Sequence, residues 1–249
     1  MSVDLTPAKV KLEDFARTFR DQLIPVNSQF SYFSSPSMAE DDLRQYLHEP
    51  ISALPPGISA LLPKSIALML VPFLERMSAK SDTRISFEKI EEPKQSPTYR
   101  MSTPGGGAVL FFATKNEEVS DYHSGLFNEI AARVSKVWSG EVRDGYFGLL
   151  RSELAAKVNG EVDEKSWRLK QALLRKPASR EGKAFKEYAR QSFEDTLTLY
   201  LHGICCDIDV EMGPRQLPSR HLRKRLEFLQ LHFPPPAGHA VFPEDLKRQ

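Results

Sequence analysis

The stretch FKEYARQSFEDTLTLYLHGI, residues 185–204, is the longest segment of the chain with a helical period. Apolar residues recur in it every three or four positions, which places them on one side of a helix: Phe193, Leu197, Tyr200 and Ile204. The segment therefore predicts a long helix with one apolar side.

Directly after this helix, the repeat of apolar residues along the sequence shortens to every second position. From Cys206 to Met212, apolar residues alternate with Asp207, Asp209 and Glu211, which is the pattern of a β-strand. On a strand these carboxylates point from one face, about 7 Å apart. A divalent cation would relieve their repulsion, and carboxylates so spaced hold magnesium beside phosphates. Two interpretations stay open: a solvated edge strand whose charges oppose aggregation, and a divalent metal site.

Helices are also predicted on both sides of residues 185–204. The expected segments run up to Pro25, from Ser37 to Pro50, from Val119 to just before Gly140, over Tyr146–Val158, from Asp163 onward and from Ser219 onward. The acidic group Glu161, Asp163 and Glu164 suits a helix start, because negative charge is favourable at that end.

Two shorter segments read as strands. Residues 84–88 alternate between polar and apolar, and residues 109–113 form a continuous apolar run after three glycines. The run Ile66–Leu74 is ambiguous, because its alanine, leucine and methionine favour helix, whereas its brevity and Pro72 favour a strand or a kinked helix. The predicted fold class is α+β, mainly α-helical with a small antiparallel β element.

The organisation along the chain favours a single domain over residues 1–249. A soft internal boundary is expected near residues 93–107, a proline- and glycine-containing loop between an N-terminal α/β half and a helical C-terminal half.

The composition gives no sign of a nucleic-acid-binding, membrane or secreted protein. The chain of 249 residues is 41% hydrophobic and 27% charged with a net charge of +1, so no overall field draws it to nucleic acid or an anionic membrane. The most apolar stretch is too short to cross a bilayer, and no secretory signal opens the sequence. Cys205 and Cys206 are adjacent and cannot form a disulfide framework, so we expect a soluble protein in a reducing, cytoplasmic setting.

Two histidines are candidate catalytic residues. His123 falls on the apolar face of the helix from Val119, as either a hydrogen-bonded core histidine or a ligand or proton carrier in a cleft. His202 lies four residues before Cys206, a spacing that puts two metal ligands on one helical face. A soft-metal site at this pair would need further ligands, and His123 or His221 would have to come from elsewhere in the fold.

The segment 165–190 is strongly basic. It holds nine basic residues against Glu181 and Glu187, and a second basic cluster lies at 215–225. Such stretches contact phosphate backbones in some proteins, although a solvated helix face is the usual explanation and aromatic residues are few here.

Three classes of function remain. Nucleotide-cradle, zinc-protease and nucleophile-elbow motifs do not occur in the sequence. The simplest interpretation is an interaction or structural protein. The alternatives are a metal-dependent hydrolase or phosphoryl-transfer enzyme using Asp207, Asp209, Glu211 and a histidine with a divalent cation, and a phosphate or nucleic-acid binder using residues 165–190. The sequence indicates no substrate, partner or oligomeric state.

Overall fold

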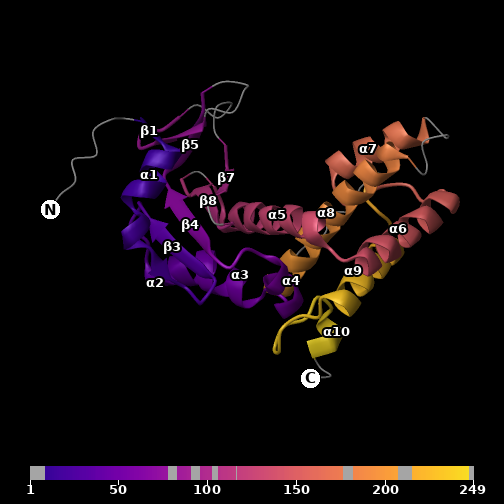
Figure 1. Ribbon diagram of the computed structural model, residues 1–249. Coiled ribbons are helices and arrows are strands. Elements are labelled where there is room, and N and C mark those ends of the chain that lie inside the picture. Colours follow the sequence, from indigo (N-terminus) through magenta and orange to yellow (C-terminus); the bar gives the residue numbers. More distant parts are fainter. Residues whose placement is uncertain are drawn as a thin grey trace. The chain divides into compact units, whose positions relative to one another are not determined.

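The computed structural model describes residues 9–77, 83–90, 96–102, 106–115, 117–175, 182–206 and 215–246. The fold is α+β and mainly helical, as predicted (Figure 1). The chain divides into two compact units: unit 1 is Met1–Glu49 with Pro63–Gly125, and unit 2 is Pro50–Leu62 with Leu126–Gln249. The expected single domain with a soft boundary near residues 93–107 stays a prediction.

Unit 1 contains a mixed five-stranded sheet in the order β2-β3-β4-β8-β7. Its central strands β3, β4 and β8 are parallel, and β2 and β7 add antiparallel edges. The bounds are β2 Ile24–Pro25, β3 Phe30–Ser34, β4 Ile66–Val71, β7 Thr98–Ser102 and β8 Ala108–Ala113. All six residues of β4 are buried, which explains its unbroken apolar sequence. The ambiguous run Ile66–Leu74 is thus extended and not helical: β4 ends before Pro72, and Phe73 and Leu74 begin strand β5 of a second sheet.

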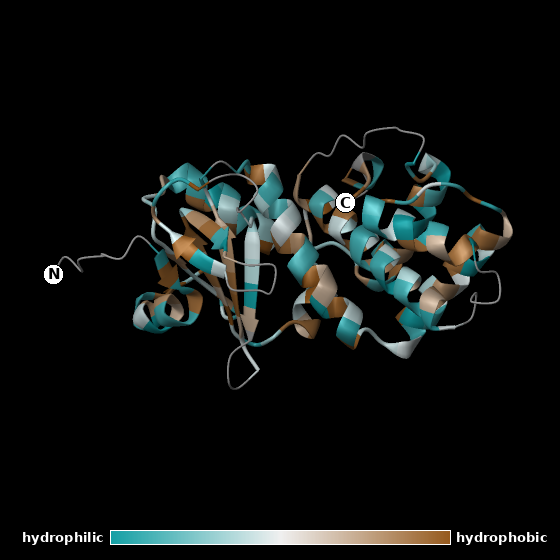
Figure 2. Cartoon of the chain, turned by 90° about the horizontal axis from the view of Figure 1, so that it is seen from above, coloured by the Kyte–Doolittle hydropathy of each residue, from teal (hydrophilic) through white to brown (hydrophobic). Residues whose placement is uncertain are grey.

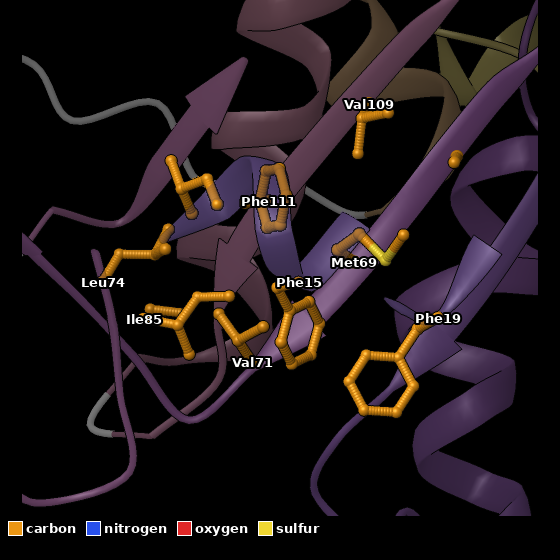
Figure 3. Packing of buried hydrophobic residues seen from close by; sticks show 11 residues of the cluster. Phe15, Phe19, Met69, Val71, Leu74, Ile85, Val109 and Phe111 are labelled. Carbon is orange, nitrogen blue, oxygen red and sulfur yellow. The ribbon is translucent and has the colours of Figure 1, made fainter. Parts of the chain in front are cut away.

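A second sheet in unit 1 is antiparallel, in the order β1-β6-β5. Its strands are β1 Lys9–Lys11, β5 Phe73–Arg76 and β6 Thr83–Ser86. Helix α1, Leu12–Thr18, contributes Phe15 to a core that also contains Leu74 and Ile85 of this sheet (Figure 3). Alternate residues of β4 and β8 complete this core, because a strand turns every second side chain to the same face: Ala67, Met69, Val71, Val109, Phe111 and Ala113.

The N-terminal helices differ from the prediction. The helix expected to reach Pro25 ends at Thr18, followed by a short 3-10 turn at Arg20–Gln22 and by β2. The second helical stretch, expected from Ser37 to Pro50, runs without a gap through α2 Glu40–Leu43, a π turn at Arg44–His48 and α3 Glu49–Ser52, and a separate helix α4 follows at Pro56–Leu61. Pro50 lies within this continuous stretch, which extends to Ser52, so it does not end the helix as expected.

Unit 2 is helical in its described part. Its helices are α4, the later part of α5 (Val119–Val137), α6 Gly140–Ala155, α7 Glu164–Leu174, α8 Lys183–Cys205, α9 Ser219–His232 and α10 Pro243–Leu246. Each of these helices carries both hydrophobic and hydrophilic residues (Figure 2). Phe193, Leu197, Tyr200 and Ile204 of α8 are all buried, as their spacing predicted.

A side-chain hydrogen bond caps the first turn of two of these helices. The Asp163 side chain accepts a hydrogen bond from the Lys165 amide at 2.8 Å, as expected for the start of α7. The Ser139 hydroxyl accepts one from Val142, so α6 begins at Gly140 and earlier than predicted. Among the described residues, no helix is long and apolar enough to span a bilayer.

Candidate functional site

The C-terminal end of α8 brings together His202, Cys205 and Cys206, which we call the α8 terminus. The Cys206 amide donates to the His202 carbonyl at 2.9 Å, so the last helical turn is closed. His202 and Cys206 therefore share a face, and a ring nitrogen of His202 lies within 4.8 Å of Cys206 Sγ. Cys205 Sγ lies 3.2 Å from Cys206 Sγ. All three side chains are partly exposed.

The chemistry of this group suits a soft metal ion. Imidazole nitrogen and thiolate sulfur are the ligands that Zn²⁺ and Cu⁺ prefer. In a tetrahedral zinc site, two ligand atoms lie about 3.5 Å apart, so the His202–Cys206 pair needs only a small side-chain adjustment. The carbonyl groups at the end of a long helix carry partial negative charge, which also favours a cation.

His123 lies in unit 1, on the first turns of α5. It is 3% exposed, so the burial predicted from the apolar face is confirmed. Its Nε2–H donates to the Gln45 carbonyl at 2.8 Å, which leaves Nδ1 as the basic ring nitrogen. Burial lowers the pKa of His123 below its ordinary value, so the ring is neutral at pH 7. His202 belongs to unit 2, and a catalytic role for either histidine stays a prediction.

The predicted metal ligands Asp207, Asp209 and Glu211 lie outside the described residues. The divalent-cation site given as an alternative for these carboxylates stays a prediction.

A second polar cluster, which the sequence did not predict, surrounds Arg225 of α9 in unit 2. The Arg225 guanidinium is fully buried and forms ion pairs with two carboxylates. Arg225 Nη2 lies 2.5 Å from Glu153 Oε2, and Arg225 Nη1 lies 2.7 Å from Glu161 Oε2. Arg225 Nη1 also donates to Ser192 Oγ at 2.8 Å.

Glu161 is the centre of further contacts in this cluster. Lys170 Nζ lies 3.2 Å from Glu161 Oε1, and Tyr188 Oη donates to the same oxygen at 2.5 Å. Four buried charged residues form what we call the ionic network: Lys170, Glu161, Arg225 and Glu153. Their two positive and two negative charges balance. Burial would raise the pKa of Glu161, but Arg225 and Lys170 outweigh it and lower this pKa to about 2.

The backbone around Gly160 fixes the position of Glu161. The Glu161 amide donates to the Arg215 carbonyl at 2.9 Å, and the Leu217 amide donates to the Glu161 carbonyl at 3.0 Å. Gly160 has a φ of 81°, and a Cβ there would lie 2.1 Å from the Gln216 carbonyl oxygen. A glycine is therefore required for this close approach.

The ionic network corrects two expectations. Glu161 does not belong to the helix start formed by Asp163 and Glu164, because its side chain is buried against Arg225. Lys170 and Arg225 belong to the two basic clusters of the sequence, yet both are buried in ion pairs and are not part of a phosphate-binding surface. Lys176 and Arg180 of the basic stretch lie outside the described residues.

Comparisons with protein-family models, with curated proteins and with solved structures found no match to the chain.

Proposed function

We propose that this protein binds a soft metal ion, Zn²⁺ or Cu⁺, at the α8 terminus. The observation that carries the proposal is the closed last turn of α8, which holds a His202 ring nitrogen within 4.8 Å of Cys206 Sγ. These two atoms are the primary ligands of the proposed site, and a change of side-chain rotamer at Cys205, whose Sγ lies 3.2 Å from Cys206 Sγ, would bring in a third.

The ligand types decide which metal binds. A site of one nitrogen and two sulfurs discriminates against Mg²⁺ and Ca²⁺, which prefer oxygen ligands. Three protein ligands would leave one position of a tetrahedral zinc site for water, as in catalytic zinc centres. A Zn²⁺ ion there would activate that water toward hydrolysis.

The proposal differs from the divalent-cation site at Asp207, Asp209 and Glu211, which follows in the sequence and stays a separate prediction. The two sites are separable by substitution. Asp209→Asn removes one carboxylate of that group and no ligand of the α8 terminus. It should leave zinc affinity unchanged and abolish binding only at a magnesium or manganese site.

The test is a zinc titration of the reduced full-length chain in competition with a chromophoric chelator. We expect one Zn²⁺ per chain, and His202→Ala and Cys206→Ser should each weaken binding at least about tenfold, as loss of one ligand does. His232→Ala is the matched control, since this partly exposed histidine packs on Phe228 of the same helix, with ring centroids 4.5 Å apart.

The results that would overturn the proposal are equally specific. Absence of stoichiometric zinc in the wild-type chain contradicts it. So does an equal loss of affinity in His202→Ala and His232→Ala, because that result would reflect surface histidines rather than a site at the α8 terminus.

A further inference from the structure

The two cysteines of the chain lie side by side at the point where α8 ends. Cys205 is the last helical residue, whereas Cys206 has extended backbone, with φ −141° and ψ 152°. This change of conformation between neighbours brings their Sγ atoms to 3.2 Å, with both side chains partly exposed. A disulfide bond is about 2.05 Å long, so the sulfur atoms are about 1 Å from bonding distance.

We propose that Cys205 and Cys206 form a peroxide-sensitive modification site that closes into a reversible disulfide between adjacent residues. One thiolate attacks a peroxide oxygen: an S–O bond forms, the O–O bond breaks, and hydroxide leaves, giving a sulfenic acid. The neighbouring thiol attacks this sulfur, so the S–S bond forms, the S–O bond breaks and water leaves. In total, two thiols and one hydrogen peroxide give one disulfide and two waters.

Proximity favours this outcome over further oxidation. A resolving thiol already held at 3.2 Å reacts as an intramolecular partner, which is far faster than attack by a second peroxide or another chain.

Strain makes the bond reversible. Adjacent Cα atoms are 3.80 Å apart across a trans peptide, closer than the usual 4.4–6.8 Å span of a disulfide. A strained disulfide has a more oxidising potential, so thiol reductants open it readily. Such a bond joins neighbouring residues and does not cross-link distant parts of the fold, so it is not a disulfide framework.

The inference stands on the thiol pair, and only its effect on metal content rests on the proposed function. Oxidation would consume both sulfur ligands, Cys205 and Cys206, and release a bound ion. The metal-free chain tests the thiol chemistry, and the zinc-loaded chain tests the release, so the failure of one proposal is distinguishable from the failure of the other.

The experiment treats the reduced, metal-free full chain with stoichiometric hydrogen peroxide and measures intact mass and thiol content. The chain has two cysteines, so any intramolecular disulfide is the Cys205–Cys206 bond. We expect a monomer that has lost two hydrogen atoms and both titratable thiols, and that dithiothreitol restores completely. Cys205→Ser should instead accumulate a sulfenic acid that dimedone traps.

Three results would overturn the inference. They are a dimedone adduct or sulfinic acid as the main product of the wild-type chain, a disulfide-linked dimer, and unchanged thiols at excess peroxide. In the zinc-loaded chain, a chromophoric chelator should detect zinc release in step with thiol loss; retention of zinc after disulfide formation would remove Cys206 from the proposed ligand set.

Discussion

Arg225 Nη1 and Glu161 Oε2 lie 2.7 Å apart, and neither side chain has any exposed surface. The two residues are far apart in the sequence, one on α9 and the other before α7, so their ion pair ties distant segments of unit 2 together. A buried ion pair adds little stability relative to well-packed apolar residues, but removing one partner leaves an uncompensated charge. The ionic network therefore specifies the arrangement of unit 2, and its single members are sensitive to substitution.

Arg225→Met should lower the free energy of unfolding by about 3–5 kcal/mol, because Glu153 and Glu161 remain buried without their guanidinium. Urea unfolding at neutral pH measures the loss. Arg220→Ala on the exposed side of the same helix is the control, with an expected change within about 0.5 kcal/mol. Equal effects of the two substitutions would mean that the buried pairing does not matter.

Glu161 should give the protein a distinct dependence on acid. Its pKa is about 2 in the folded chain against an ordinary 4.5. The unfolded chain therefore takes up this proton first as the pH falls, so the contribution, on the order of 3 kcal/mol, is present above about pH 4.5 and is lost between pH 4.5 and 2. Glu161→Gln should be less stable at pH 7 and show a shallower loss in this window. Parallel stability curves would contradict the low pKa.

Gly160→Ala should destabilise the protein by at least about 1–3 kcal/mol, since its φ is 81° and the new Cβ would collide with the Gln216 carbonyl. Gly148→Ala provides the matched control, because this exposed glycine within α6 has open space around the added Cβ. Replacing a helical glycine by alanine should stabilise by up to about 1 kcal/mol. Thermal unfolding that ranks the two variants in the opposite order would refute this assignment.

Buried His123 also predicts a pH effect. Burial lowers its pKa below 6.5 in the folded chain, so the unfolded chain protonates first and stability is lost as the pH falls below about 6.5. His123→Phe should remove this component and should cost about 1–3 kcal/mol at pH 7, because the Gln45 carbonyl loses its donor. The difference in melting temperature between wild type and variant, followed from pH 8 to pH 5, measures both; a difference independent of pH would show that His123 does not titrate in this range.

Local patterns explain what the sequence could predict. Three features depend only on neighbours within a few residues: the helical repeat of apolar residues along α8, the apolar run of β4 and the Asp163 cap. The proximity of His202 and Cys206 was also predictable, because residues four apart lie close together where the last turn of a helix is closed.

Contacts between distant segments were not predictable in the same way. Glu161 resembled a helix start and Arg225 resembled a surface cation, because a charged residue gives no local signal of a buried partner far away in the chain. The helix expected over Tyr146–Val158 ends at Ala155, and Gly160, whose φ is positive, contacts Gln216 of a distant segment, which requires the folded chain.

The most direct test of the proposed metal site is the absorption spectrum of the reduced chain during a Co²⁺ titration. Thiolate coordination gives intense near-ultraviolet charge-transfer bands, and tetrahedral geometry gives visible bands. We predict both sets of bands, saturating at one ion per chain and lost in Cys206→Ser. A spectrum without thiolate bands, or one unchanged by Cys206→Ser, would contradict metal binding at the end of α8.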